Sequence, residues 1–433
     1  MDVESAVTID LGLERGEPDS YRHPTRSTVP DWFPAATLAV LVLFCVAASG
    51  APAKSPLSQI VRLEVGPADV YALTDDGVLL AQTFGELTSY DLGTGRMRWQ
   101  AGQSTPAYRL RLADGLVLMR PWTVGSAEAR TTAIAIGNGV RRWERPGSVV
   151  SVAGSSALLA VQTVRSQAGA NRRVQGPIDA LDPVTGYTRW TVPVPSSGVL
   201  LSVPGPADAG ARMLLVRDDR TMAVHDLDTG ERLAQTTVPA ADYDPDNPAV
   251  AGGMILLRHP GAAGTEITAY DPVTLRASWT VPAREAYVIK QCGVLACLLG
   301  PEGVRAIDPA TGGERWDRPQ WRDVSAIGAM WVAYGGADDT SLIGIVDPQA
   351  GVVEVELAGW RLVGGSGGGD HLLVTRSIAT GGRTMVAVAR PGVRQPRLLT
   401  DLPAGTGDCE AVPSRLVCRS VYGELVVWAY REG

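Results

Sequence analysis

Four cysteines outside the N-terminal apolar segment could form disulfides or a metal site, and they occur as two close pairs, Cys292 with Cys297 and Cys409 with Cys418. An even number of cysteines in near-neighbour pairs is typical of local disulfides in an oxidising compartment. A zinc site is an alternative, although four and eight intervening residues do not follow a zinc-ribbon pattern; free buried cysteines are another. We predict the bridges Cys292–Cys297 and Cys409–Cys418 between facing positions of paired strands, with Cys45 as a free thiol.

Three carboxylates at alternate positions of the segment 242–246 have the spacing of a calcium-binding loop. An EF-hand loop then requires Gly at its sixth position and Glu at its twelfth, where this chain has Asn247 and Gly253. The prolines at 245 and 248 also suit a plain turn, so we predict a turn and no metal site. Three adjacent aspartate pairs are likewise predicted to lie in solvated turns: Asp75–Asp76, Asp218–Asp219 and Asp338–Asp339.

No other pattern in the sequence indicates catalysis. The histidines are too dispersed for a metal cluster: His23, His225, His259 and His371. There is no Gly-x-Ser-x-Gly nucleophile motif, and the glycine-rich segment 364–369 lacks the Lys-Ser/Thr of a phosphate-binding loop. The sequence therefore gives no catalytic, cofactor-binding or metal-binding residue, and enzymatic activity is left open but not favoured.

Composition and charge exclude several classes of protein. The chain of 433 residues has 39 basic and 46 acidic residues and a net charge of −7, which argues against a nucleic-acid partner. Its 45% hydrophobic residues are enough to bury a core, so disorder over the whole chain is excluded. Lys54 and Lys290 are the only lysines, and the scattered arginines indicate a bias toward arginine codons.

An uncharged segment near the N-terminus, residues 33–51, predicts one transmembrane helix. A cleaved signal peptide is the alternative, but the preceding residues 1–31 are long and net acidic, unlike the short basic start of a signal. Basic residues flank the segment almost equally, so the predicted disulfides decide the orientation. We expect a single-pass protein of the cell membrane with a disordered cytoplasmic tail (1–31), a linker (52–58) and an extracytoplasmic domain (59–433).

One phrase, Asp-x-x-Thr-Gly followed four residues later by Trp, repeats along the rest of the chain. Asp and Gly favour a tight turn, and Trp falls at a constant offset on the next strand, where it can cover a neighbouring repeat. The structural repeat residues are Asp91, Gly95 and Trp99; Trp143; Asp182, Gly186 and Trp190; Asp226 and Gly230; Asp271 and Trp279; Asp308, Gly312 and Trp316; and Asp347 and Gly351.

Further apolar strands precede each phrase, which gives a unit of about 40 residues and four strands, typical of a propeller blade. The phrase resembles the tryptophan-docking repeat of PQQ-like β-propellers, the quinoprotein alcohol dehydrogenase-like superfamily. The resemblance covers residues 57–433 and implies an all-β fold, a single propeller of eight or possibly nine four-stranded blades. The segment 59–65 is predicted to supply the strand that closes the ring.

The resemblance also bears on activity. Quinone-binding members cover the quinone with a disulfide between adjacent cysteines and pass electrons to a c-type haem, and this sequence contains neither Cys-Cys nor Cys-x-x-Cys-His. We therefore expect a propeller without a cofactor that binds an envelope protein or polymer, as an interaction module or assembly scaffold. Its layout is similar to that of the propeller lipoprotein of the outer-membrane assembly machinery. A quinoprotein-type dehydrogenase and a ligand sensor are the alternatives.

Overall fold

The computed structural model describes residues 30, 32–48, 56–102, 107–121, 130–152, 157–165, 171–203, 210–336, 341–365, 369–378 and 382–431. The chain divides into two units, Met1–Ser55 and Pro56–Gly433. The first unit contains the helix α1 (Phe33–Ala48), which begins at the segment predicted to span a membrane. Among the residues described, no helix is long and apolar enough to cross a membrane. The predicted tail, except residue 30, and most of the predicted linker lie outside the described residues.

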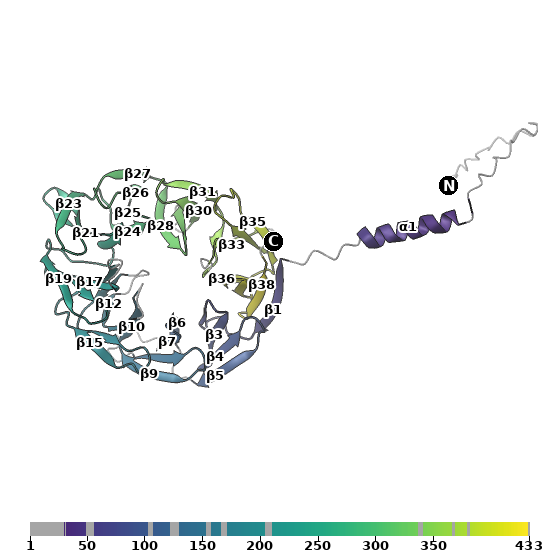
Figure 1. Ribbon diagram of the computed structural model, residues 1–433, viewed down its shortest axis with the longest axis horizontal. Helices are drawn as coiled ribbons and strands as arrows, with labels where there is room; N and C mark the ends of the chain where they lie inside the picture. Colours follow the sequence, from purple (N-terminus) through teal and green to yellow (C-terminus); the bar gives the residue numbers. More distant parts are fainter. Residues whose placement is uncertain are drawn as a thin grey trace, which may run out of the picture. The chain divides into compact units, whose positions relative to one another are not determined.

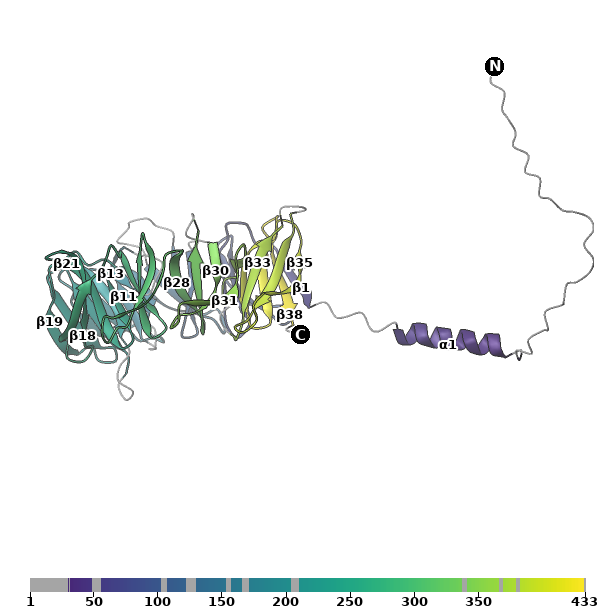
Figure 2. The ribbon, with the colours of Figure 1, turned by 90° about the horizontal axis from the view of Figure 1, so that it is seen from above.

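The second unit consists of β-sheets arranged as the blades of a propeller around one axis (Figure 1). The described residues form nine sheets, which settles the predicted number of eight or nine blades as nine. Except in blades 4 and 9, the strands of each blade run in sequence order from the axis outward, and neighbouring strands are antiparallel (Figure 1). Seen from the edge, the blades form a flat disc (Figure 2).

Blades 1 to 3 contain the following strands, given from the axis outward: β2 (Tyr71–Leu73), β3 (Val78–Thr83), β4 (Glu86–Asp91) and β5 (Met97–Gly102); β6 (Ala107–Ala113), β7 (Leu116–Pro121), β8 (Arg130–Ala135) and β9 (Arg141–Pro146); β10 (Ser148–Ser151), β11 (Leu158–Val161), β14 (Ile178–Leu181) and β15 (Thr188–Val192).

Blades 4 to 6 contain these strands in the same order: β16 (Gly198–Val203), β17 (Arg212–Arg217), β18 (Thr221–Asp226) and β19 (Arg232–Thr237); β20 (Pro248–Ala251), β21 (Met254–Gly261), β22 (Gly264–Tyr270) and β23 (Ala277–Pro282); β24 (Val288–Cys292), β25 (Leu295–Gly300), β26 (Gly303–Ile307) and β27 (Glu314–Arg318).

Blades 7 to 9 complete the ring: β28 (Trp321–Ile327), β29 (Met330–Gly335), β30 (Ser341–Asp347) and β31 (Val352–Glu356); β32 (Arg361–Leu362), β33 (Leu372–Ser377), β34 (Thr384–Ala389) and β35 (Arg397–Leu402); β36 (Gly407–Val412), β37 (Arg415–Arg419), β38 (Leu425–Tyr430) and β1 (Leu57–Leu63).

The burial of the strands follows their distance from the axis. The second strands are covered on both faces by neighbouring blades, so they are the most apolar strands; all six residues of β25 are buried. The outermost strands alternate between exposed and partly covered residues, as β5 does. The core is correspondingly divided into separate clusters between adjacent blades, such as Val332 and Ile345 of blade 7 packed with Leu372 of blade 8.

Blade 9 joins the two ends of the propeller. Its outermost strand, β1, pairs with β38 from Leu57 opposite Tyr430 to Leu63 opposite Leu425. The amide of Arg431 donates a hydrogen bond to the carbonyl of Pro56 at 2.9 Å. The N-terminal segment therefore closes the ring as expected, two residues earlier than the predicted range 59–65.

Blade 4 differs from the predicted four-stranded unit because its sheet has six strands. The two additional strands, β12 (Thr163–Arg165) and β13 (Arg172–Val174), come from the connection between the second and third strands of blade 3. They form a hairpin, and β13 pairs with β16, the innermost strand of blade 4. This hairpin was not predicted from the sequence.

Candidate functional site: the loop face of the propeller

The repeat aspartates bind their own turns. Oδ1 of Asp91 accepts hydrogen bonds from the amide of Thr94 at 2.7 Å and from its hydroxyl at 2.8 Å. These bonds hold the pKa of Asp91 below its usual value. Gly95 ends the turn at φ 70°, the left-handed region that glycine adopts without strain. Asp182, Asp226 and Asp271 make the same two bonds to Thr185, Thr229 and Thr274, whereas Asp308 and Asp347 bind backbone amides of their turns.

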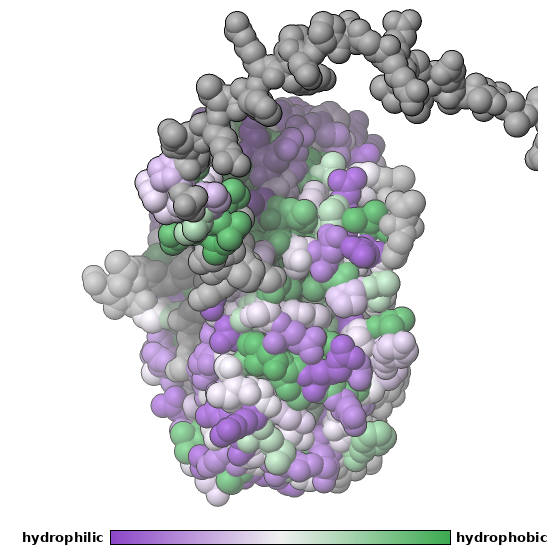
Figure 3. All heavy atoms as spheres, turned by 90° about the vertical axis from the view of Figure 1, so that its right-hand side faces the viewer, coloured by the Kyte–Doolittle hydropathy of each residue, from purple (hydrophilic) through white to green (hydrophobic). Residues whose placement is uncertain are grey.

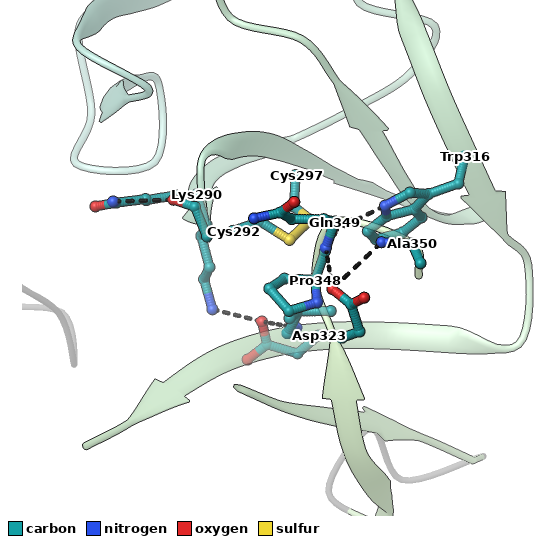
Figure 4. Close-up of a disulfide and its surroundings, with 12 residues drawn as sticks. Lys290, Cys292, Cys297, Trp316, Asp323, Pro348, Gln349 and Ala350 are labelled. Carbon is teal, nitrogen blue, oxygen red and sulfur yellow. Dashed lines mark hydrogen bonds and ion pairs between the residues drawn. A yellow bond between two sulfur atoms is a disulfide. The ribbon is translucent and has the colours of Figure 1, made fainter. Parts of the chain in front are cut away.

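The repeat tryptophans join each blade to the next. The ring of Trp316 lies so close to Gly351 that an added Cβ would be 2.6 Å from it, and its Nε1–H donates to the carbonyl of Pro348 at 3.0 Å (Figure 4). Four other seams have the same pair of contacts: Trp99 to Gly139 and Ile136, Trp143 to Gly186 and Pro183, Trp190 to Gly230 and Leu227, and Trp279 to Gly312 and Pro309.

Between blades 4 and 5, neither the tryptophan nor the glycine of this contact is present. Ala234 occupies the position of Trp on blade 4, and Leu275 occupies the position of Gly on blade 5. The Leu275 side chain is 2% exposed and packs in the same cluster as Ala234. Leu275 nevertheless keeps the left-handed backbone of the glycine it replaces, with φ 54°. A leucine side chain from one blade thus fills the space that a tryptophan from the other blade fills elsewhere.

This exchange predicts strong coupling between the two positions. Ala234→Trp alone should clash with Leu275, and Leu275→Gly alone should leave a cavity, so each should destabilise the propeller by about 1–3 kcal/mol. The double variant restores the Trp–Gly contact and should recover about 1–3 kcal/mol of the summed loss. Denaturant unfolding of the four proteins measures this coupling energy; additive losses would contradict the proposed exchange.

Both predicted disulfides form. Cys292 of β24 and Cys297 of β25 are fully buried with Cα atoms 5.5 Å apart, and their bridge lies beside Trp316 and Pro348 (Figure 4). The expected facing arrangement is wrong for this pair, because Cys292 lies opposite Leu295 and Cys297 lies opposite Lys290. The bridge is instead diagonal, two positions out of register.

The second bridge lies in blade 9. It joins Cys409 of β36 to Cys418 of β37, with Cα atoms 4.0 Å apart. The pairing of these strands is irregular between Gly407 and Glu410, and this irregular stretch lies opposite Cys418. Here the expected arrangement across two paired strands holds.

Non-reducing peptide mapping of the full-length protein should therefore recover Cys292 linked to Cys297, Cys409 linked to Cys418, and Cys45 as a free thiol. Both bridges close short loops, so replacing either pair by alanine should cost about 2–3 kcal/mol. Alkylation of four further thiols in the native protein, unfolded under non-reducing conditions, would contradict both the bridges and the expected oxidising compartment.

The two faces of the disc have different turns. In an antiparallel blade, the turns after the first and third strands lie on one face, and the turns after the second and fourth strands lie on the other. All repeat turns follow third strands, so we name their side the repeat face. We name the opposite side the loop face. Its second-to-third connections vary from two residues, 84–85 in blade 1, to the long connection 162–177 in blade 3.

The inserted hairpin is fixed to the loop face by polar contacts. Arg173 of β13 forms ion pairs with Asp218 at 2.5 Å and with Asp244 at 3.3 Å. The side-chain amide of Asn171 donates to the carbonyls of Pro245 and Pro248, both at 2.9 Å. These contacts attach the hairpin to the connection between blades 4 and 5.

That connection contains the three carboxylates with calcium-loop spacing. One of them, Asp244, is paired with Arg173, and Arg258 donates to the side-chain oxygen of the adjacent Asn247. Burial lowers the pKa of Arg258 from its usual value. In the described part of the chain, no group of three or more His, Cys, Asp or Glu side chains is placed to hold a metal ion. The loop is a turn in which the guanidinium group of Arg173 pairs with one of the three carboxylates, Asp244.

The remaining polar residues singled out in the sequence stay apart. His225, His259 and His371 lie in blades 4, 5 and 8, and each is buried. His225 contacts the carbonyl of Gly230 at 3.1 Å, and burial lowers its pKa. Asp76 and Asp219 bind Thr74 and Thr221 within their turns. His23 and the pair Asp338–Asp339 lie outside the described residues, as does part of the segment 364–369.

Among the described residues, the most exposed aromatic side chains on the loop face lie in blades 9 and 1, which are neighbours in the ring. Phe84 is 100% exposed, and Tyr422 is 81% exposed, with Val421 beside it at 64%. Phe84 also has a left-handed backbone with φ 49°, which the two-residue hairpin turn that it forms with Gly85 (φ 82°) requires. We name Phe84, Val421 and Tyr422 the aromatic patch. On the face in Figure 3, by contrast, hydrophobic residues form small groups among hydrophilic ones.

The sequence profile of one protein family matches the chain over residues 54–197 and 174–326, which together exceed half of its length. The chain belongs to the family described as outer membrane protein assembly factor BamB. This result confirms the expected PQQ-like propeller repeat. No curated protein matches the sequence.

Solved structures to which the chain is similar include BamB from Moraxella catarrhalis, which is 15% identical over 86% of this chain and 100% of its own, with a TM-score of 0.39. The WD40 domain of SCAP from fission yeast is 11% identical over 86% of this chain and 97% of its own, with a TM-score of 0.41. A europium-containing methanol dehydrogenase is 13% identical over 64% of this chain and 72% of its own, with a TM-score of 0.37.

In this BamB-family propeller, the repeat residues identified in the sequence stabilise the fold. The carboxylates of the repeat face bind their own turns, and its tryptophans bind the next blade. The sequence analysis did not identify the residues of the aromatic patch as candidates for a functional site. One signal was available, because Phe84 is the only phenylalanine of the three in the chain that lies outside the apolar segment.

Proposed function

We propose that the chain is a membrane-tethered, extracytoplasmic propeller that acts as a protein-interaction scaffold. The observation that carries this proposal is the match to the BamB family, described as an outer membrane protein assembly factor. Two disulfides support an oxidising compartment. The apolar segment 33–51, in which α1 lies, is the proposed tether.

The aromatic patch is the proposed contact surface for an envelope protein. Exposed aromatic side chains on a rigid scaffold lose little conformational entropy on binding and are enriched at interaction hot spots. Phe84 is held in a two-residue turn between β3 and β4, both of which are largely buried. The patch therefore presents a rigid apolar group to a partner.

Proximity labelling from the full-length protein in its native membrane tests this function. The double variant Phe84→Ser/Tyr422→Ser should reduce labelling of the principal envelope partner at least tenfold. Val184→Ser/Tyr187→Ser is the matched control, since these residues are 66% and 75% exposed on the repeat face, and it should retain that partner. An unchanged partner set in the first variant, or no envelope protein above background in the wild type, would contradict the proposal.

The orientation requires its own test. Alkaline phosphatase fused after Gly433 folds only where its disulfides form, so activity is expected in the full-length fusion. A fusion that is produced but inactive would place the propeller in the cytoplasm.

A further inference from the structure

Three arginines of blade 2 converge on one small pocket at the seam with blade 3. The pocket is lined by Arg109 and Arg111 of β6, Arg120 of β7, the hydroxyl residues Thr131 and Ser148, and Leu118 and Val149. These strands lie at the inner side of the ring (Figure 1). Thr131 and Ser148 are 3% and 4% exposed, and Arg111 and Arg120 are partly buried.

The strand register places positive charges directly beside each other. Arg109 lies opposite Arg120 across β6 and β7. Continuing the β7–β8 register one residue beyond Met119–Thr132 places Thr131 next to Arg120, and Thr131 lies opposite Arg145 of β9. Arg109 and Arg120 thus face each other directly in this row, whereas Arg145, at its outer end, donates to the hydroxyl of Thr188. Like charges that face each other across a sheet are destabilising, so this row requires compensation.

Within the described residues, no acidic side chain forms an ion pair with Arg109 or Arg120 that would offset this repulsion. Neither Arg109 nor Arg120 forms an ion pair or side-chain hydrogen bond within the described part of the chain, and the buried Nε of Arg145 has no partner there. Glu144, the acidic residue of β9, lies opposite Thr132 and pairs with Arg130 and Arg141 on the other side of the sheet. Glu410 of β36 interacts electrostatically with Arg109 without pairing with it.

We propose that this arginine pocket binds a single oxyanion group, a phosphate or a carboxylate. Guanidinium groups are donors that recognise such oxygens, and Ser148 also lines the pocket, whereas the hydroxyl of Thr131 already donates to the carbonyl of Gly147 at 2.7 Å. The oxyanion comes either from a dissolved solute or from an acidic side chain of a partner protein. The site is separate from the aromatic patch, so this inference does not depend on the proposed function.

Calorimetric titration of the purified full-length protein, at constant ionic strength, tests the pocket with two probes. Inorganic phosphate represents a dissolved anion, and the peptide N-acetyl-Glu-Glu-Glu-amide represents an acidic partner segment. At least one probe should bind the wild type. Arg120→Gln should weaken that binding at least tenfold, while Arg142→Gln, an equal charge change at an exposed position of the same blade, should leave it unchanged.

The two probes distinguish the source of the group: phosphate binding supports a solute, and binding of the peptide alone supports a partner side chain. Arg109→Gln, at an exposed position, replaces Arg120→Gln if the latter does not fold. Binding of neither probe would overturn the proposal. Equal weakening by the pocket variant and by Arg142→Gln would also overturn it, because it would show attraction by overall charge alone.

Discussion

Deletion of residues 56–63 is expected to abolish cooperative unfolding of the propeller, because it removes the strand that closes the ring. Leu57 and Leu63 are 7% and 8% exposed, and burying two leucines contributes about 3–6 kcal/mol. The deletion also removes the Val61 side chain that packs on Gly95 of blade 1, and it exposes the buried strand β38 as an edge. The combined loss is comparable to the total stability of an ordinary domain.

Tryptophan fluorescence during denaturant unfolding measures this effect. The deletion variant should lose the sharp transition of the full-length chain and should aggregate through its open edge. A synthetic peptide of residues 56–65, added in excess, should restore the transition by pairing with β38. A deletion variant with an unchanged midpoint would show that β1 does not hold the ring together.

Gly351→Ala is expected to destabilise the seam between blades 6 and 7 by about 2–4 kcal/mol, through overpacking and backbone strain. Gly351 has φ 64°, and an added Cβ would lie 2.6 Å from the ring of Trp316. That ring is confined by an edge-to-face contact with Trp321 at 5.4 Å and by its hydrogen bond to Pro348, so it cannot move aside without losing both.

Gly392→Ala is the matched control for this variant. Gly392 has a similar backbone, with φ 79°, but an added Cβ would meet no atom within 4 Å. It should therefore show only the backbone cost of about 1 kcal/mol. Equal losses in the two variants, measured by denaturant unfolding, would attribute the effect to backbone strain and contradict the importance of the tryptophan contact.

The sequence was sufficient for the features that depend on local spacing. The turn residues from Asp91 onward recur at constant offsets, because each turn needs its own hydrogen-bonding side chain and its own left-handed residue. Pairing of Cys409 with Cys418 followed from the same logic, since both lie on one hairpin. The closing strand was predictable because a ring cannot leave a three-stranded blade with an exposed edge.

Features that depend on contacts between blades were not predictable in this way. The β12–β13 hairpin pairs with a strand of the next blade, and the short sequence of β13 carries no sign of that partner. Leu275 departs from the glycine of the repeat, and the reason lies in the neighbouring blade, where Ala234 packs in the same cluster. The opposition of Arg109 and Arg120 depends on the register of two strands, which runs without interruption from Ala113–Leu116 to this pair.

The meeting of the two ends of the propeller in blade 9 has a mechanical consequence. Leu57 and Tyr430 are partners at the same end of an antiparallel strand pair, next to the bond between Arg431 and Pro56. A pulling force applied between the two ends would therefore open β1 from β38 one residue pair at a time, as a zipper opens, instead of shearing all pairs together. In a chain tethered through its N-terminus, tension on the tether would act first on the strand that closes the ring.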